Sequence, residues 1–305
     1  MDPAEWATIL DGYEWTQRLN YLGISGFTVL LCDFLHTFPD EVRLMWPQPL
    51  SPLKALFLFL RYYIMGHMIL LINYGYPTGV TTQHCTTTFI AMTISSGFLI
   101  VASEWVLFIR VWAFSGRNKK VLAFLGFQAI AIHGATKITL VTLFIRSVRF
   151  SPVPFHLNMP CLVADSNDKL LSGTFGLLLW GLVSIMSIMI FFVYQRHRHL
   201  KTKLLSVFYR DGVFYFVCLS MLATVNIVVN TTSKARGFKY LFTQIEVISH
   251  VILSTRMLIH LRLCAEREAG TDTQAVCPST MHFKSRKPHT VESTDSEFTV
   301  ASTLI

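Results

Sequence analysis

The sequence predicts an all-α polytopic membrane protein, a seven-transmembrane-helix bundle. Seven apolar stretches lie between residues 19 and 261, joined by loops too short to fold as domains. A membrane-spanning helix needs about 20 mostly apolar residues, and five of the stretches reach that length. Hydrophobic residues make up 52% of the chain and charged residues only 14%, against about 25% charged in soluble domains. Such a chain has too little polar surface to cover a globule in water.

Three parts follow from this pattern. Residues 1–18 are expected to lie outside as an N-terminal segment, and residues 262–305 to form a cytoplasmic tail. The tail is rich in Ser and Thr with almost no aromatic residues, so it is predicted to be disordered. The membrane domain, residues 19–261, has predicted spans at about residues 19–35, 53–72, 89–114, 121–145, 170–194, 213–229 and 240–261.

The distribution of Lys and Arg predicts the orientation, because basic residues near span ends favour the cytoplasmic side. The fifth loop and its flanks contain Arg196, Arg198, Lys201, Lys203 and Arg210, whereas the second loop contains no basic residue. This bias favours a multi-pass protein of the plasma or an internal membrane with its N-terminus outside and its C-terminus in the cytosol. Because the basic residues flank spans, the net charge of +8 does not indicate nucleic-acid binding.

The six cysteines show no CxxC spacing, so no metal site is predicted. In the predicted orientation, Cys85 and Cys161 both lie on the oxidising face, where disulfides persist. A Cys85–Cys161 disulfide is one interpretation, and two unrelated thiols is the other. Asn230 begins the only glycosylation sequon but abuts the sixth span, which favours an unmodified side chain. Cys264 at the membrane edge is a palmitoylation candidate or a plain juxtamembrane thiol.

Three stretches carry a resemblance to a known family. The first runs from Cys32-Asp33-Phe34-Leu35 through residues 41–46 and 54–57 to Leu60-Arg61-Tyr62; the others are residues 103–118 and 254–262. Together they resemble a fungal, mainly basidiomycete, family of seven-span membrane proteins defined only by a domain of unknown function (domain of unknown function 6533). In the second stretch, Trp112 and Phe114-Ser115 depart from the residue types expected of that family. The resemblance implies a fold and a kingdom, not an activity.

Ionisable residues inside spans are costly, by about 2.5–3.5 kcal/mol at a helix centre on insertion scales, and therefore indicate function or pairing. Asp33 and Arg61 lie at depths that a long Arg side chain can bridge. They are interpreted as a structural ion pair that locks the first helical hairpin, or as two separately hydrated groups.

The seventh span is the most polar. Glu246, His250 and Ser254 recur at every fourth residue and therefore share one helical face. Lys137 in the fourth span lies at a depth similar to Glu246, and Glu104 is a further intramembrane carboxylate. These five residues are the candidate polar cavity for a ligand or ion. Interhelical hydrogen bonding, or a structural Glu246–Lys137 pair, is the alternative.

A receptor or sensor is the leading functional hypothesis, based on fold analogy. It would involve membrane lipids, an unidentified ligand and a cytosolic partner that contacts the inner loops and tail. A transporter or channel is the first alternative, although no proline lies inside a predicted span. A non-catalytic membrane scaffold is the second. Neither HExxH nor G-x-S-x-G occurs, so no enzyme and no cofactor is predicted.

Overall fold

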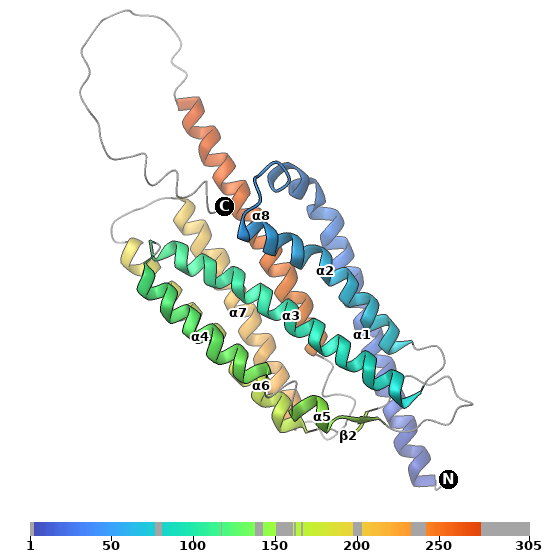
Figure 1. Ribbon diagram of the computed structural model, residues 1–305. Coiled ribbons are helices and arrows are strands. Elements are labelled where there is room, and N and C mark those ends of the chain that lie inside the picture. The colour runs from blue at the N-terminus through green and yellow to red at the C-terminus, as the bar shows by residue number, and fades with distance from the viewer. Residues whose placement is uncertain are drawn as a thin grey trace, which may run out of the picture.

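Seven long helices lie side by side in an elongated bundle in the computed structural model (Figure 1). The structure describes residues 3–76, 81–116, 118–137, 143–150, 161, 163–165, 167–197, 203–232 and 242–275. Within these residues the long helices are α1 (Pro3–Leu44), α2 (Pro52–Gly75), α3 (Thr82–Phe114), α4 (Lys119–Lys137), α6 (Asp168–His197), α7 (Lys203–Thr232) and α8 (Thr243–Ala275).

A small structured segment lies between α4 and α6. It consists of the single turn α5 (Ile145–Ser147) and two short antiparallel strands, β1 (Arg149–Phe150) and β2 (Val163–Asp165). In Figure 1 this segment lies at the end of the bundle where α1 begins, whereas α8 ends at the opposite end. The described long helices run along the bundle an odd number of times, so α1 begins at one end and α8 finishes at the other.

Five of the described helices are long and apolar enough to cross a membrane: α1, α2, α3, α6 and α7. They indicate an all-α, multi-pass membrane protein. Helices α4 and α8 fall short of the same test of length and hydropathy. In α8 the polar residues of its first four turns, among them Glu246, His250 and Arg256, lower the mean hydropathy.

Several helices extend beyond the apolar stretches that predicted them. Helix α1 begins at Pro3, inside the predicted outer segment. Asp11, Glu14 and Arg18 lower the hydropathy of this segment, but its backbone is still helical. Helix α8 continues to Ala275, so the prediction of disorder is wrong for residues 262–275. Residues 276–305 of the tail lie outside the described residues. The fourth predicted span ends at residue 145; α4 is described as far as Lys137, and residues 138–142 lie outside the described residues.

Pro39 lies inside α1, in a segment that is itself apolar enough to span the membrane. The first span predicted from sequence ends at residue 35, which places Pro39 in the loop that follows. A proline in a helix leaves the carbonyl four residues earlier, here that of Leu35, without its usual donor. In the structure the guanidinium of Arg61 donates to the adjacent carbonyl of Phe34 at 2.9 Å. A polar neighbour of this kind makes an intramembrane proline tolerable.

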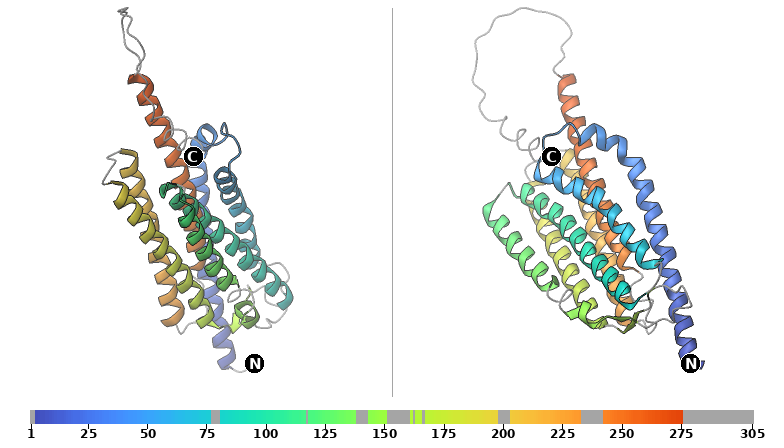
Figure 2. Two further views of the ribbon diagram at one scale, coloured as in Figure 1. Left: turned by 60° about the vertical axis from the view of Figure 1, so that its left-hand side comes forward. Right: turned by 45° about the vertical axis from the view of Figure 1, so that its right-hand side comes forward.

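Helices α3 and α8 form the centre of the bundle. Helix α8 packs against α1, α2, α3 and α7, and α3 packs against α2, α4, α6 and α8 (Figure 2). The buried core between them is built from large apolar side chains such as Phe57, Leu60, Leu107, Leu182 and Phe216. Polar residues on the inner faces of α3 and α8 are consequently enclosed by protein.

Candidate functional site

The polar face predicted on the last long helix points into the bundle. Glu246, His250 and Ser254 of α8 are each 0% exposed. Their spacing of four residues places them one above another on a single face. Because α8 is central, this face meets α3 and α7 rather than lipid.

Helix α7 supplies direct partners for this face. The side-chain amide of Asn226 donates to Glu246 Oε2 at 2.6 Å, and also lies 3.3 Å from the carbonyl oxygen of Phe242. The hydroxyl groups of Tyr215 and Ser254 are hydrogen-bonded at 3.0 Å. Asn226 and Tyr215 are nearly fully buried, so both interactions lie inside the protein.

Helix α3 contributes a second buried carboxylate, Glu104, which is 2% exposed. Its Oε2 lies 3.2 Å from Nε2 of His133 on α4. The carboxyl groups of Glu104 and Glu246 lie close enough to interact electrostatically, and Tyr215 interacts with Glu104 and with Arg110. Arg110 itself donates to the sulfur of Met257. Residues from four helices, α3, α4, α7 and α8, therefore meet in one polar region.

We call Glu104, Tyr215, Asn226, Glu246, His250 and Ser254 the interior polar site. Several of its buried atoms have no hydrogen-bond partner among the described residues. These atoms are Oε1 of Glu104, Oε1 of Glu246, Oδ1 of Asn226 and both ring nitrogens of His250. Buried polar atoms are almost always paired in folded proteins, because an unpaired one forfeits its interaction with water. The interior polar site is thus suited to a further polar occupant.

The structure thus brings together four of the five residues of the predicted cavity: Glu104, Glu246, His250 and Ser254. The side chain of the fifth, Lys137, lies outside the described residues. The nearest described partner of Glu246 is Asn226, an uncharged amide that sequence reasoning did not single out. Asn226 could have been recognised from the sequence, because it is a polar amide within an apolar span. No comparable feature of the sequence marks Tyr215.

His67 and His133 both have interhelical partners. The ring nitrogens of His67 lie 3.1 Å from Ser95 Oγ and 3.0 Å from Gln244 Oε1. His133 lies beside Glu104, as described above. Within the described residues, no group of three or more His, Cys, Asp and Glu side chains is arranged to hold a metal ion.

A second buried cluster joins α1, α2 and α8, and we call it the hairpin network. The guanidinium of Arg61 lies 3.3 Å from Asp33 Oδ2 and 3.0 Å from Glu41 Oε2. Arg61 also donates to Thr37 Oγ1 at 2.5 Å and lies over the ring of Phe34 at 4.5 Å. The predicted Asp33–Arg61 contact is therefore one part of a larger network.

Two interactions extend the hairpin network. Glu41 Oε1 accepts hydrogen bonds from the hydroxyl of Tyr62 at 2.7 Å and from the indole N–H of Trp46 at 3.3 Å. Arg256 of α8 forms an ion pair with Asp33. Two carboxylates thus face two guanidinium groups. Such paired charges with complete hydrogen bonding are typical of a structural lock.

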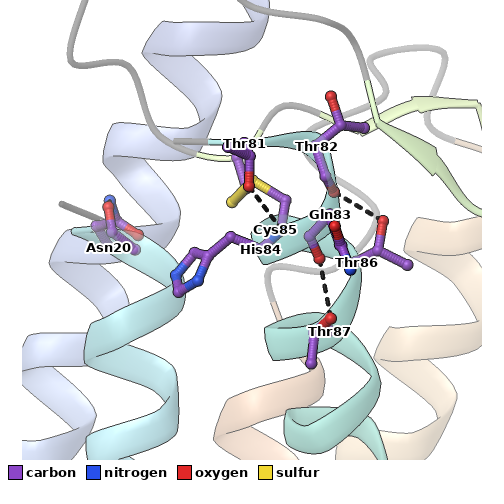
Figure 3. The surroundings of a disulfide bond; sticks show 10 residues. Asn20, Thr81, Thr82, Gln83, His84, Cys85, Thr86 and Thr87 are labelled. Carbon is purple, nitrogen blue, oxygen red and sulfur yellow. Dashed lines mark hydrogen bonds between the residues drawn. A yellow bond between two sulfur atoms is a disulfide. The ribbon is translucent and has the colours of Figure 1, made fainter. Parts of the chain in front are cut away.

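Cys85 and Cys161 form a disulfide that ties the start of α3 to the segment before β2. Figure 3 shows Cys85 in the first turn of α3, where Thr81 Oγ1 accepts from the His84 backbone N–H at 3.2 Å. Both cysteines pack against aromatic residues that include Phe89, Phe144 and Phe150. This end of the bundle is therefore closed by a covalent link and an apolar cluster.

The two predicted modification sites have different outcomes. Asn230 is 2% exposed and lies within α7, where its amide donates to the carbonyl of Asn226 at 2.8 Å. Burial leaves no space for a glycan, so the glycosylation candidate is wrong for this fold. Cys264 belongs to α8, but its side chain lies outside the described residues.

Residues 21–66 match a family described as "Family of unknown function (DUF6533)". No curated protein matches the chain. The matched segment comprises most of α1, the loop that follows and the first half of α2, and it contains Asp33, Thr37, Glu41 and Arg61. The matched segment thus contains the α1–α2 half of the hairpin network. Every residue of the interior polar site lies outside the matched segment.

Proposed function

We propose that the protein is a receptor- or sensor-like membrane protein whose ligand site is the interior polar site. In this proposal α1, α2, α3, α4, α6, α7 and α8 all cross the bilayer, as in the fungal seven-span family that the sequence resembles. The N-terminus faces outside and the end of α8 faces the cytosol of a plasma or internal membrane. The single observation that supports a ligand site is the set of buried, unpartnered polar atoms on Glu104, Asn226, Glu246 and His250.

The position of α8 supports a signalling role. One face of α8 carries Glu246 and His250, and its later turns carry Arg256, which pairs with Asp33 of the hairpin network. Beyond the bundle, Glu266 of α8 lies 3.2 Å from Arg43 at the end of α1. A ligand that shifts α8 would therefore change contacts at its other end.

The partners follow from the same arrangement. Apolar side chains such as Phe127, Ile130 and Trp180 are exposed on the outer surface of the bundle and would face lipid. A cytosolic partner would meet the inner loops, the helical end of α8 and the tail.

A thermal-shift screen of the purified full-length protein against lipids, sterols, peptides and ions tests the proposal, because a ligand that binds the native state raises its apparent stability. Glu246→Gln should abolish the shift given by a hit and leave expression intact. The matched control is Glu266→Gln, which changes an exposed carboxylate of the same helix and should respond as wild type. A hit whose shift persists in Glu246→Gln and Glu104→Gln would contradict the site.

An architectural role for Glu246 would give a different pattern. If Glu246 formed a structural pair with Lys137, Glu246→Gln would lower the stability by about 3–5 kcal/mol, because one buried charge would lose its partner. Adding Lys137→Met would then restore the stability. Such a rescue, with ligand response retained in the double variant, would refute the ligand-site role.

Transport or conduction is the second candidate function, and one observation favours it. Two carboxylates interact inside the bundle, and intramembrane carboxylates mark ion pathways in many transporters. Ion flux into proteoliposomes, abolished by Glu104→Gln, would support transport over reception. Proteoliposomes without flux but with a ligand-induced stability shift would support reception.

A further inference from the structure

The unpartnered atoms of the interior polar site share one chemical property. Oε1 of Glu104 and Oε1 of Glu246 are carboxylate oxygens, which act only as acceptors when the group is ionised, and Oδ1 of Asn226 is an amide acceptor. A neutral imidazole such as that of His250 offers one further acceptor. An anion would need donors at these positions. An occupant that satisfies acceptors must be rich in donors or carry a positive charge.

The local charge leads to the same conclusion. Glu104 and Glu246 interact electrostatically while 2% and 0% exposed. Two like charges in a low-dielectric interior repel each other, so one group takes up a proton unless another cation lies near them. The described hydrogen bond to Glu246 comes from the uncharged Asn226, and Glu104 Oε2 lies 3.2 Å from Nε2 of His133. The side chain of Lys137 lies outside the described residues. Arg110 lies six residues further along α3, about 9 Å along the helix axis, where it contacts Met257.

The ligand set also limits the size of the charge. Structural zinc and calcium sites use three or more protein ligands. Within the described part of the chain, no such group of His, Cys, Asp and Glu is found. Glu104 lies beside His133, and a protonated His133 would balance one of the two negative charges. One further positive charge would then balance the other.

We infer that the interior polar site binds a monovalent cation, either an alkali metal ion or the ammonium group of a small primary amine. This inference rests on the proposed function, because it names the ligand class of the same site. The cation would lie between the free oxygens of Glu104 and Glu246, with Asn226 and His250 as further acceptors. Asn226 would keep its hydrogen bond to the other oxygen of Glu246.

The test compares melting temperatures of the full-length protein in four salts at equal ionic strength: NaCl, KCl, ethylammonium chloride and choline chloride. Choline serves as the control because its quaternary nitrogen has no N–H donor. We expect the melting temperature to rise with the logarithm of concentration in at least one of the first three salts, but not in choline. A response to NaCl or KCl alone identifies a metal ion, and one to ethylammonium alone identifies an amine. Equal melting temperatures in all four salts would overturn the inference.

Substitutions test which residues are needed for the cation-dependent rise in melting temperature. Glu104→Gln and Glu246→Gln keep the shape of the side chain and an acceptor oxygen but remove the charge, so each should lose the cation-dependent rise. In choline, where the repulsion between carboxylates is not compensated, each variant should melt at or above the wild-type temperature. The matched control is Glu41→Gln, which neutralises an equally buried carboxylate of the hairpin network and should keep the rise. Retention of the rise in both site variants would overturn the inference.

A measurement on the wild-type protein avoids any dependence on variant folding. A hydrophobic carbodiimide labels buried protonated carboxyl groups, and peptide mass spectrometry locates the label. The effective cation should decrease labelling of Glu104 and Glu246, because it favours their ionised form, and leave Glu41 unchanged. Labelling that is equal in all four salts would contradict cation binding. A cation effect without any lipid, sterol or peptide hit in the wider screen would leave this inference standing and refute only the receptor. A lipid, sterol or peptide hit with no response to cations would do the reverse.

Discussion

At the residue scale, Arg61 is the charge on which the hairpin network depends. It is 3% exposed and contacts two carboxylates, a hydroxyl, a backbone carbonyl and an aromatic ring. Its planar guanidinium can reach several acceptors at once, which a lysine cannot. Removing Arg61 would leave Asp33 and Glu41 buried with too few partners.

We therefore predict that Arg61→Met lowers the free energy of unfolding by about 3–5 kcal/mol, the usual cost of removing one partner of a buried pair. Denaturant or thermal unfolding in detergent measures it. Arg18→Met is the matched control, because Arg18 and Glu14 form an exposed pair that should contribute at most about 1 kcal/mol. Similar stabilities for the two variants would show that the hairpin network is not a lock.

At the scale of elements, the first two helices are joined at both ends. The hairpin network holds one end, and at the other the side-chain amide of Asn20 donates to the carbonyl of Gly75 at 2.8 Å. A methyl group at Gly75 would lie 2.9 Å from Cγ of Asn20, closer than such atoms can approach. The absence of a side chain at Gly75 leaves room for the side chain of Asn20 to reach the Gly75 carbonyl.

Gly75→Ala should accordingly destabilise the protein by about 1–3 kcal/mol, the usual cost of overpacking. Gly97→Ala in α3 is the control, since no atom lies within 4 Å of the methyl group it would add. That change should raise stability by roughly 0.5–1 kcal/mol, because alanine favours helix over glycine. Melting temperatures of the two variants should thus move in opposite directions, and a parallel change would contradict the close approach.

At the scale of the whole molecule, the bundle has two chemically different ends. One end carries the disulfide, the aromatic cluster around Phe89 and the start of α1. The other carries the ends of α1, α3 and α6 and the projecting end of α8 (Figures 1 and 2). In the sequence, basic residues concentrate next to these helix ends, which favours a cytosolic location for them.

This orientation is testable with Lys119 at the start of α4 and Lys169 in the first turn of α6, which lie at opposite ends in Figure 1. In a background without Cys32, Cys218, Cys264 and Cys277, we expect Lys169→Cys to react with an impermeant maleimide in intact cells. Lys119→Cys should react only after permeabilisation. Reaction of both from the same side would exclude a seven-span arrangement.

Hydropathy alone predicted an all-helical membrane protein, because the cost of exposing backbone to lipid leaves few other structures for such a chain. It located the seven helices but not their ends, since helices continue through polar turns such as those at the start of α1. Helical spacing placed Glu246, His250 and Ser254 on one face, and depth suggested Asp33 as a partner of Arg61. These inferences use only distances along a single helix or between consecutive helices.

Tertiary structure decided which faces of distant helices meet. Glu104 lies near Glu246, Asn226 donates to Glu246, and Arg256 pairs with Asp33, although these residues are far apart in the sequence. Hydropathy is averaged over a helix and does not specify its rotation or its neighbours. The sequence therefore supplied the polar side chains of the interior, and only the packing of α3, α7 and α8 gathered them into one site.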